Sequence, residues 1–168
     1  MDFSIIANEW PVYWQGLYTT VWLVTVSLLI GLAIALPLAL LRNSRVWLIK
    51  SLAWAYIYFF RGTPLLVQLF LIYYGAGQWQ WLRESMAWEW FSQAWFCAVL
   101  AFTLNTSAYT AEIIRGAIKG MPQGQVEAAY AYGMTRFQAL RRVILPNSMR
   151  RALPAYSNEV IFMLHGSA

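Results

Sequence analysis

Two polar side chains in apolar surroundings are the residues of this chain best suited to bind a solute. Glu159 falls just inside an apolar segment that begins near Leu153, and Asn105 falls midway through another. An ionisable group in a membrane-type segment is costly unless it is paired or hydrated, so its default interpretation is functional. The alternatives are an interfacial ion pair of Glu159 with Arg150 or Arg151, and an interhelical hydrogen bond of the Asn105 amide.

A second candidate site is the polar segment between these two apolar stretches. Small and apolar residues recur there at helical spacing, largely with arginines between them: Val126, Ala129, Tyr130, Gly133, Phe137, Leu140 and Ile144. Gly133 is expected to break the segment into two short helices. Composition alone leaves two interpretations open, an amphipathic helix lying on anionic lipid or a docking element for a cytosolic partner.

The remaining polar residues predict ordinary structural roles. Glu112 and Arg115 have the spacing of an i,i+3 ion pair, with a gating role as the alternative. Arg61 is expected to be a snorkelling cation, with an inner gate as the alternative. His165 has no ligand-type neighbour in the sequence, so no metal site is expected.

The sequence lacks two kinds of motif that catalysis would require. There is no convincing set of nucleophile, base and orienting residue, so no catalytic residue is predicted. There is also no glycine-rich phosphate loop ending in Gly-Lys-Ser or Gly-Lys-Thr, so the chain itself is not expected to be an ATPase.

The elements that position these residues are expected to be membrane helices. Of the 168 residues, 60% are hydrophobic and 11% are charged, whereas soluble domains carry about a quarter charged residues. Apolar runs of the length that crosses a bilayer predict spans at about 17–41, 64–77, 94–114 and from about 153. A short interfacial helix at 52–60 is expected before the second span, and a single helix broken at 61–64 is the alternative.

The predicted fold is therefore an all-α, polytopic transmembrane helical bundle that forms one domain over residues 1–168. Because only about fifteen residues of the fourth span are present, the bundle is expected to be incomplete at its C-terminal end. Of the twelve cations, three lie in the first connection and seven in the third, residues 115–151. The positive-inside rule places both connections in the cytoplasm and the N-terminus outside. The net charge of +5 is explained in this way and does not predict nucleic-acid binding.

The polar loop also resembles a known family signature. Glu127-Ala128-Ala129, Gly133 and Ile144-Leu145-Pro146 are similar to the signature loop of ATP-binding-cassette importer permeases. Other motifs resemble the polar-amino-acid branch, and in particular the histidine/lysine/arginine/ornithine permeases. They are Phe60-Arg61-Gly62-Thr63-Pro64-Leu65 with Gln68, Leu104-Asn105-Thr106 with Ala108-Tyr109 and Glu112, and Leu153-Pro154-Ala155 with Asn158-Glu159.

This resemblance implies a function and a set of partners. The loop residues would form coupling helices that insert into a groove of an ATPase subunit: Glu127, Ala128, Ala129, Gly133, Leu145 and Pro146. ATP and Mg²⁺ would be bound by that partner, with no cofactor on this chain. A second permease subunit, the same or similar, and a periplasmic or extracellular solute-binding protein would complete the complex in the bacterial inner (plasma) membrane.

The resemblance also implies that Glu159 and Asn105 hold a basic amino acid. The sequence departs from arginine-specific relatives at one place, because His165 and Gly166 stand where those relatives can carry a second acid. The sequence therefore leaves open which basic amino acid is preferred, and whether the permease pair is homo- or heterodimeric.

Two other functions remain possible from the sequence. An ion-gradient-driven transporter or channel would explain an intramembrane acid such as Glu159 but gives the polar loop no role. A membrane anchor without a transport path of its own would explain neither Glu159 nor Asn105.

Overall fold

The computed structural model describes residues 9–44 and 46–167, and over these residues every regular element is a helix. The all-α fold class is therefore confirmed. The ends of the predicted domain (1–8 and 168) and Arg45, one of the cations of the first connection, lie outside the described residues. The helices are α2 (Trp10–Arg42), α3 (Trp47–Gly62), α4 (Leu65–Ala76), α5 (Gln80–Arg83), α6 (Trp88–Phe91), α7 (Ala94–Lys119), α8 (Gln123–Ala131), α9 (Arg136–Ala139), the π-helix η1 (Leu140–Ile144) and α10 (Leu145–Ser167).

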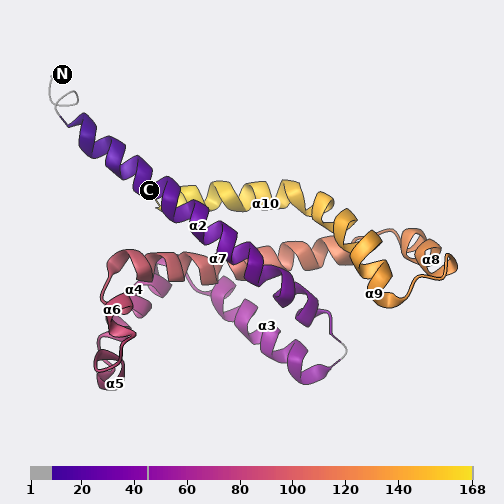
Figure 1. Cartoon of the computed structure of the whole chain (residues 1–168), viewed down its shortest axis with the longest axis horizontal. Coiled ribbons are helices and arrows are strands. Elements are labelled where there is room, and N and C mark those ends of the chain that lie inside the picture. The colour runs from indigo at the N-terminus through magenta and orange to yellow at the C-terminus, as the bar shows by residue number, and fades with distance from the viewer. Residues whose placement is uncertain (1–8, 45, 168) are drawn as a thin grey trace.

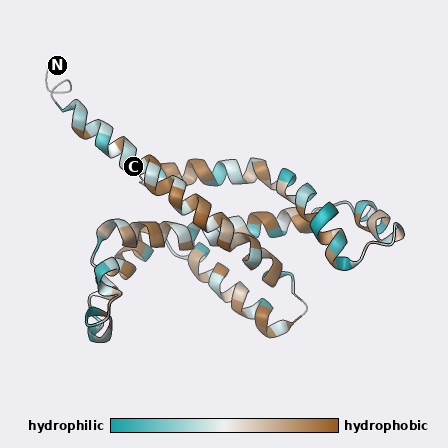
Figure 2. Cartoon of the chain, in the orientation of Figure 1, coloured by the Kyte–Doolittle hydropathy of each residue, from teal (hydrophilic) through white to brown (hydrophobic). Residues whose placement is uncertain are grey.

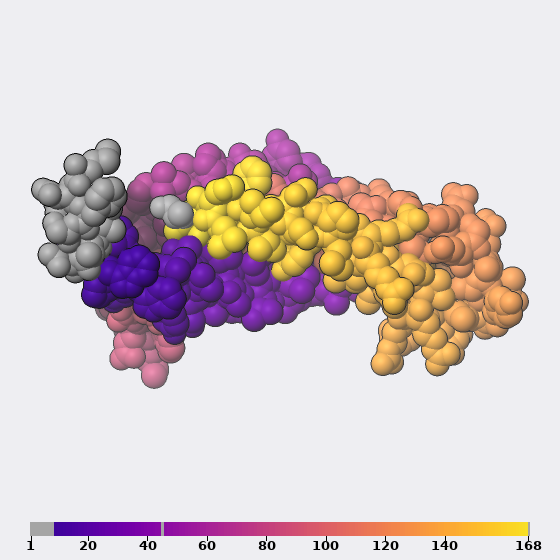
Figure 3. Space-filling model, turned by 90° about the horizontal axis from the view of Figure 1, so that it is seen from above, coloured from indigo at the N-terminus to yellow at the C-terminus, as the bar shows by residue number. Residues whose placement is uncertain are grey.

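The central element is α7, which packs against α2, α3, α4 and α10. In Figure 1, α5 and α6 lie at one end of α7, and α8 and α9 lie at the other. Hydrophobic residues dominate α2 and α4 and much of α7, whereas polar residues gather on α8 and α9 (Figure 2). Seen from above in Figure 3, α10 runs along α2, and the α8–α9 end projects beyond the bundle. The polar loop therefore lies at one end of the bundle of apolar helices.

Small residues on α2 bring it into close contact with α7. Ser27, Gly31, Ala35 and Ala39 recur every four residues along one face of α2, and all are buried. Such a stripe lets two helix backbones approach closely, which is a common basis of helix association in membranes. The Ser27 hydroxyl donates a hydrogen bond of 3.4 Å to the carbonyl of Val99 on α7.

The closest approach between these helices is at Gly31, and it makes a testable prediction. A Cβ atom there would overlap the side-chain methyl of Thr106 and lie 3.5 Å from the backbone nitrogen of Ser107. Overpacking of this kind costs about 1–3 kcal/mol. Gly31→Ala is therefore expected to lower the thermal unfolding temperature in detergent. Gly16→Ala is the matched control, because a Cβ at Gly16 meets nothing within 4 Å. Equal unfolding temperatures for the two variants would contradict this packing.

The second apolar stretch forms two helices, α3 and α4, which are bent by 103° from one another. The bend follows from Pro64, because a proline pushes the preceding residue toward extended backbone, and Thr63 has φ −116° and ψ 140°. The structure thus has the two separate helices of the expected arrangement, with α3 longer than the expected 52–60; an interfacial position of α3 stays a prediction. By length and composition, α2 and α7 are long and apolar enough to cross a membrane, and α3 with α4 makes a third candidate if the bent pair is one span.

Several helices extend beyond the apolar runs that predicted them. α2 begins at Trp10 rather than 17, α7 continues to Lys119, and α10 begins at Leu145 rather than near 153. The predicted boundaries followed hydropathy, but charged residues such as Arg150 and Arg151 are good helix formers and do not end a helix. Residues 115–119 and 145–151 of the predicted loop are consequently helical parts of α7 and α10. Where the bilayer begins along these helices stays a prediction.

Candidate functional site

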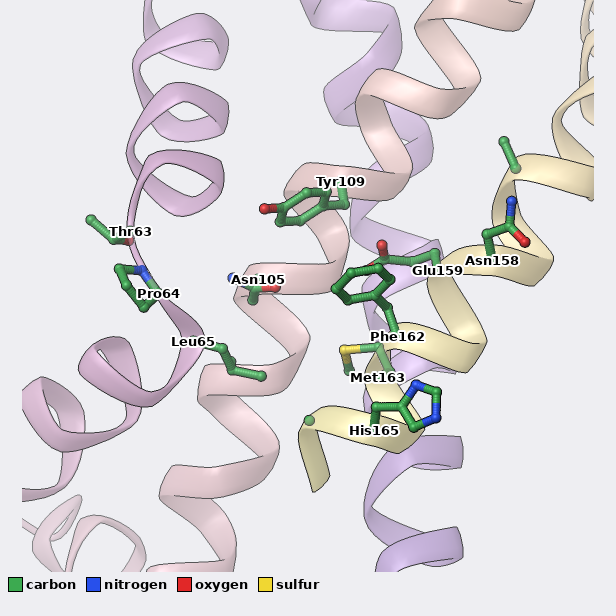
Figure 4. Close-up of a pocket in the computed structure, with 12 residues that line it drawn as sticks. Thr63, Pro64, Leu65, Asn105, Tyr109, Asn158, Glu159, Phe162, Met163 and His165 are labelled. Atoms are coloured by element: carbon green, nitrogen blue, oxygen red, sulfur yellow. The ribbon is translucent and has the colours of Figure 1, made fainter. Parts of the chain in front are cut away.

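The structure brings Asn105 and Glu159 together in the wall of one cavity of about 640 Å³. Asn105 comes from α7, Glu159 comes from α10, and the α3–α4 bend closes a third side (Figure 4). The lining residues are Thr63, Pro64, Leu65, Asn105, Tyr109, Ala155, Asn158, Glu159, Phe162, Met163, His165 and Gly166. The cavity therefore lies at the junction of elements that are far apart in the sequence.

Helix α10 supplies more than half of the residues in this wall. Ala155, Glu159, Phe162 and Gly166 lie three or four residues apart, with Asn158 next to Glu159, so one face of the helix presents all of them to the same space. From the sequence, only Glu159 on this face was expected to bind the solute, although Ala155, Asn158 and Gly166 were named in comparison with the family. The i, i+3, i+4, i+7 spacing around Glu159 was the signal that could have found the others.

Glu159 is only partly exposed and has no ion-pair partner within 4 Å among the described residues. The expected alternative, a pair with Arg150 or Arg151, is not formed. Arg151 instead donates a hydrogen bond of 2.7 Å to the carbonyl of Gly120 at the C-terminal end of α7, where a cation is favoured by the helix dipole.

Asn105 makes the interhelical hydrogen bonds that were one of its two interpretations. Its side-chain nitrogen donates to the carbonyl of Phe60 at 3.2 Å and to Oε1 of Gln68 at 3.1 Å. Its side-chain oxygen has no hydrogen-bond partner among the described residues. Because Asn105 also lines the cavity, that oxygen remains available to accept a hydrogen bond from a solute.

Gln68 is the polar residue whose role the sequence analysis missed. Its side chain is 2% exposed, and its nitrogen donates to the carbonyls of Phe60 and Thr63 at 2.8 and 2.9 Å. These carbonyls end α3 and have no partner within the helix. Gln68 therefore satisfies the backbone at the bend and ties it, through Asn105, to α7. A lone glutamine four residues after a proline in an apolar helix was the available signal.

Loss of the Gln68 hydrogen bonds is expected to make the backbone at the α3–α4 bend less stable. Gln68→Leu keeps a similar side-chain size but leaves buried acceptors unsatisfied, which costs about 1–3 kcal/mol. We expect faster amide hydrogen exchange in residues 60–68 and a lower unfolding temperature. Gln80→Leu is the control, because Gln80 is exposed and bonds only the side chain of Glu84. Unchanged exchange at the bend would show that Gln68 does not hold it.

The polar loop forms two short helices, as predicted from Gly133. Gly133 has φ +75° and separates α8 from α9. Glu127 and Ala128 are exposed on α8, whereas Ala129 is buried. Leu145 and Pro146, the remaining predicted loop residues, lie in the first turn of α10. The loop also exposes three aromatic side chains, with Tyr130, Tyr132 and Phe137 being 45%, 86% and 68% exposed, so its apolar surface faces outward rather than into the bundle.

The expected ion pair of Glu112 and Arg115 is confirmed. Arg115 Nε donates to both carboxylate oxygens of Glu112 at 2.8 Å. Arg42, at the end of α2, adds a second cation 3.8 Å from the same carboxylate, and the sequence did not predict this contact. Arg61 lies over the ring of Tyr109, with its guanidinium carbon 5.1 Å from the ring centroid. No group of three or more metal-ligating side chains is found in residues 9–44 and 46–167.

Apolar helices around a cavity with a few polar groups on an otherwise apolar wall, and a helical polar loop at one end, are the arrangement expected of a polytopic membrane permease. Two comparisons support this class. Residues 27–168 match the family model described as the binding-protein-dependent transport system inner membrane component. A crystal structure of an amino acid ABC transporter with histidines superposes with a TM-score of 0.86 at 40% identity, over 99% of this chain and 74% of that one. The chain belongs to this family of inner-membrane permease components.

Curated proteins of similar sequence are amino acid and opine permeases. The chain is 47% identical to the nopaline transport system permease of Agrobacterium fabrum, over its whole length and 70% of that protein. It is 45% identical to the histidine/lysine/arginine/ornithine transport system permease of Escherichia coli K12, over 98% of its length and 73% of that protein. It spans 63% and 58% of two octopine permeases at 46% and 48% identity.

Proposed function

We propose that the chain is the permease subunit of an ATP-driven importer for polar, basic amino acids: histidine, arginine, lysine or ornithine. The observation that carries this proposal is the charge of the cavity. Glu159 is the only formally charged residue among those that line it, so a cationic side chain is electrostatically preferred over a neutral or acidic one. The cavity volume of about 640 Å³ is within the range of about 300–1,000 Å³ that small-molecule sites occupy.

The other lining groups fit the common part of an amino acid. The Asn105 oxygen is an acceptor that suits an α-ammonium group, and the Asn158 amide supplies both a donor and an acceptor. Phe162 and Met163 provide apolar contact for an aliphatic side chain. A site with a few convergent polar groups on an otherwise apolar wall is typical of small-molecule recognition.

The loop supports a partner that supplies the energy. Three aromatic side chains of the α8–α9 loop, Tyr130, Tyr132 and Phe137, are exposed, as expected of a helical segment that docks into a groove. We assign that groove to an ATPase subunit, which binds ATP and Mg²⁺. Closure of two such subunits would move the coupling helices of a permease pair and open the cavity to the outer face, where a solute-binding protein delivers the amino acid.

The proposed orientation places the N-terminus of α2 outside and the α8–α9 end in the cytoplasm. The support is the distribution of cations, seven of which lie in residues 115–151, together with the positive-inside rule. In this orientation the exposed aromatic side chains of the loop face the compartment that holds ATP.

The test is substrate-stimulated ATP hydrolysis by the complete transporter, reconstituted with its ATPase and its binding protein. Stimulation by arginine, lysine, histidine or ornithine above the rate without amino acid is the expected result. Stimulation by neutral or acidic amino acids alone would retain the importer and overturn the substrate assignment. Absence of a copurifying ATPase, with uptake driven by an ion gradient, would overturn the proposed class.

A further inference from the structure

Another cavity, of about 460 Å³, is lined by residues of α2, of α7 and of the C-terminal part of α3. Three arginines line it from three different helices: Arg42 from α2, Arg61 from α3 and Arg115 from α7. Glu112 is the only acid among the lining residues, which leaves a formal excess of two positive charges. None of the roles proposed above uses this cavity.

Glu112 offers one negative charge to a cavity lined by three cations. Arg115 engages both carboxylate oxygens of Glu112, so the strongest acceptor positions of that group are already taken. Arg42 approaches the same carboxylate only to 3.8 Å, and its Nε is buried without a hydrogen-bond partner among the described residues. A buried donor without an acceptor is costly, at about 1–3 kcal/mol. An added anion in this cavity would supply the missing acceptor.

The apolar part of the lining indicates which kind of anion fits. Trp54, Tyr58 and Arg61 occupy one face of α3 at intervals of one helical turn, so two aromatic rings lie beside the cationic end of the groove. Trp54 and Tyr58 are 48% and 67% exposed. Aromatic side chains of this kind are enriched at the headgroup level of bilayers, and apolar surface next to a cation cluster matches a ligand with an anionic head and a hydrocarbon tail.

The position of the cavity along the helices agrees with a bilayer surface. Arg42 is the last residue of α2 and ends a run with no charge after Glu9. Glu112 and Arg115 fall in the last three turns of α7, at the end of the predicted span 94–114. Arginine can bury its aliphatic stem and keep its guanidinium at the interface, which allows Arg61 to reach the same site from α3.

We propose that this groove binds the phosphate of an anionic phospholipid, with Arg42, Arg61 and Arg115 as donors and with Trp54 and Tyr58 against the glycerol and acyl chains. Guanidinium groups are suited to phosphate because their forked donors match its oxygens. Basic pockets between membrane helices bind lipid headgroups in the same way. Inorganic phosphate offers the same chemistry without the apolar contact.

The test uses the assembled transporter in nanodiscs that contain phosphatidylcholine with or without phosphatidylglycerol. Lipids that remain bound are counted by native mass spectrometry. The wild-type complex is expected to retain phosphatidylglycerol, and Arg42→Gln and Arg61→Gln are each expected to bind it about tenfold more weakly. Lys50→Gln is the matched control, because Lys50 is an exposed cation on α3 that does not line the groove.

The outcomes separate the possible sources of the anion. A loss of bound phosphatidylglycerol in both arginine variants but not in Lys50→Gln supports the lipid site. Inorganic phosphate that binds with the same arginine dependence, without retained lipid, keeps the phosphate site and assigns it to the free anion. Equal binding by all variants, or an equal loss in Lys50→Gln, overturns the proposal, as does finding the groove filled by a carboxylate of the second permease subunit.

Discussion

Glu159→Gln is expected to abolish the preference of the transporter for cationic amino acids. The substitution keeps the size of the side chain, replaces one acceptor oxygen by an NH2 donor, and removes the only formal charge in the cavity wall. A hydrogen bond to a charged group is worth about 1.5–3 kcal/mol, so arginine-stimulated ATP hydrolysis is expected to require roughly 10- to 100-fold more substrate. Stimulation by glutamine, which is neutral, is expected to change far less.

The experiment is a substrate titration in proteoliposomes with wild type, Glu159→Gln and a control. Glu9→Gln is the control, since Glu9 is an exposed residue at the start of α2 and carries the same change of charge. Equal losses for arginine and glutamine would indicate a structural role for Glu159. An unchanged arginine titration would remove Glu159 from the substrate site while leaving the family assignment intact.

Gly133→Val is expected to uncouple ATP hydrolysis from transport without preventing membrane insertion. Gly133 has φ +75°, a region in which a non-glycine residue costs about 1–2 kcal/mol and a β-branched residue is a true outlier. No atom lies within 4 Å of a Cβ built at Gly133, so the effect arises from backbone strain and not from a clash. The strain is relieved by turning α8 relative to α9, which displaces the exposed aromatic side chains.

We expect at least a tenfold fall in coupled transport, because about 1.4 kcal/mol corresponds to a factor of ten. Two further variants serve as controls for Gly133→Val. Gly133→Asn is expected to retain most activity, because asparagine tolerates the left-handed conformation. Gly124→Val alters a glycine within α8 that has no positive φ and no neighbour within 4 Å of a Cβ. Normal transport by Gly133→Val would contradict a docking role for the loop and favour a transporter that needs no ATPase.

The sequence predicted those features that depend on local chemistry. A glycine between two amphipathic stretches predicted the break at Gly133, because few other residues adopt a positive φ. The spacing of Glu112 and Arg115 predicted their ion pair, because residues three apart are neighbours on a helix. The long apolar runs predicted the positions of α2 and α7, although not their ends.

The sequence did not predict contacts that depend on the packing of distant helices. The Gln68–Asn105 hydrogen bond joins residues 37 positions apart, and Arg42 meets Glu112 only because α2 crosses α7. Local spacing contains no information about either contact. The same is true of the cavity: the charge of Glu159 made it a candidate from the sequence, whereas its neighbours Phe162 and Met163 resemble ordinary apolar residues of a helix.

The π-helix at Leu140–Ile144 determines which face of α10 points toward the cavity. Its hydrogen bonds run from i to i+5, so this turn holds one residue more than an α-helical turn. Each residue of an α-helix turns the chain by about 100°. Deleting one residue here would allow a regular α-helix but would swing the face of α10 that bears Asn158 and Glu159 away from the cavity. The short π-helix thus fixes the angle between the loop that we propose docks to the partner and the acid that we propose binds the solute.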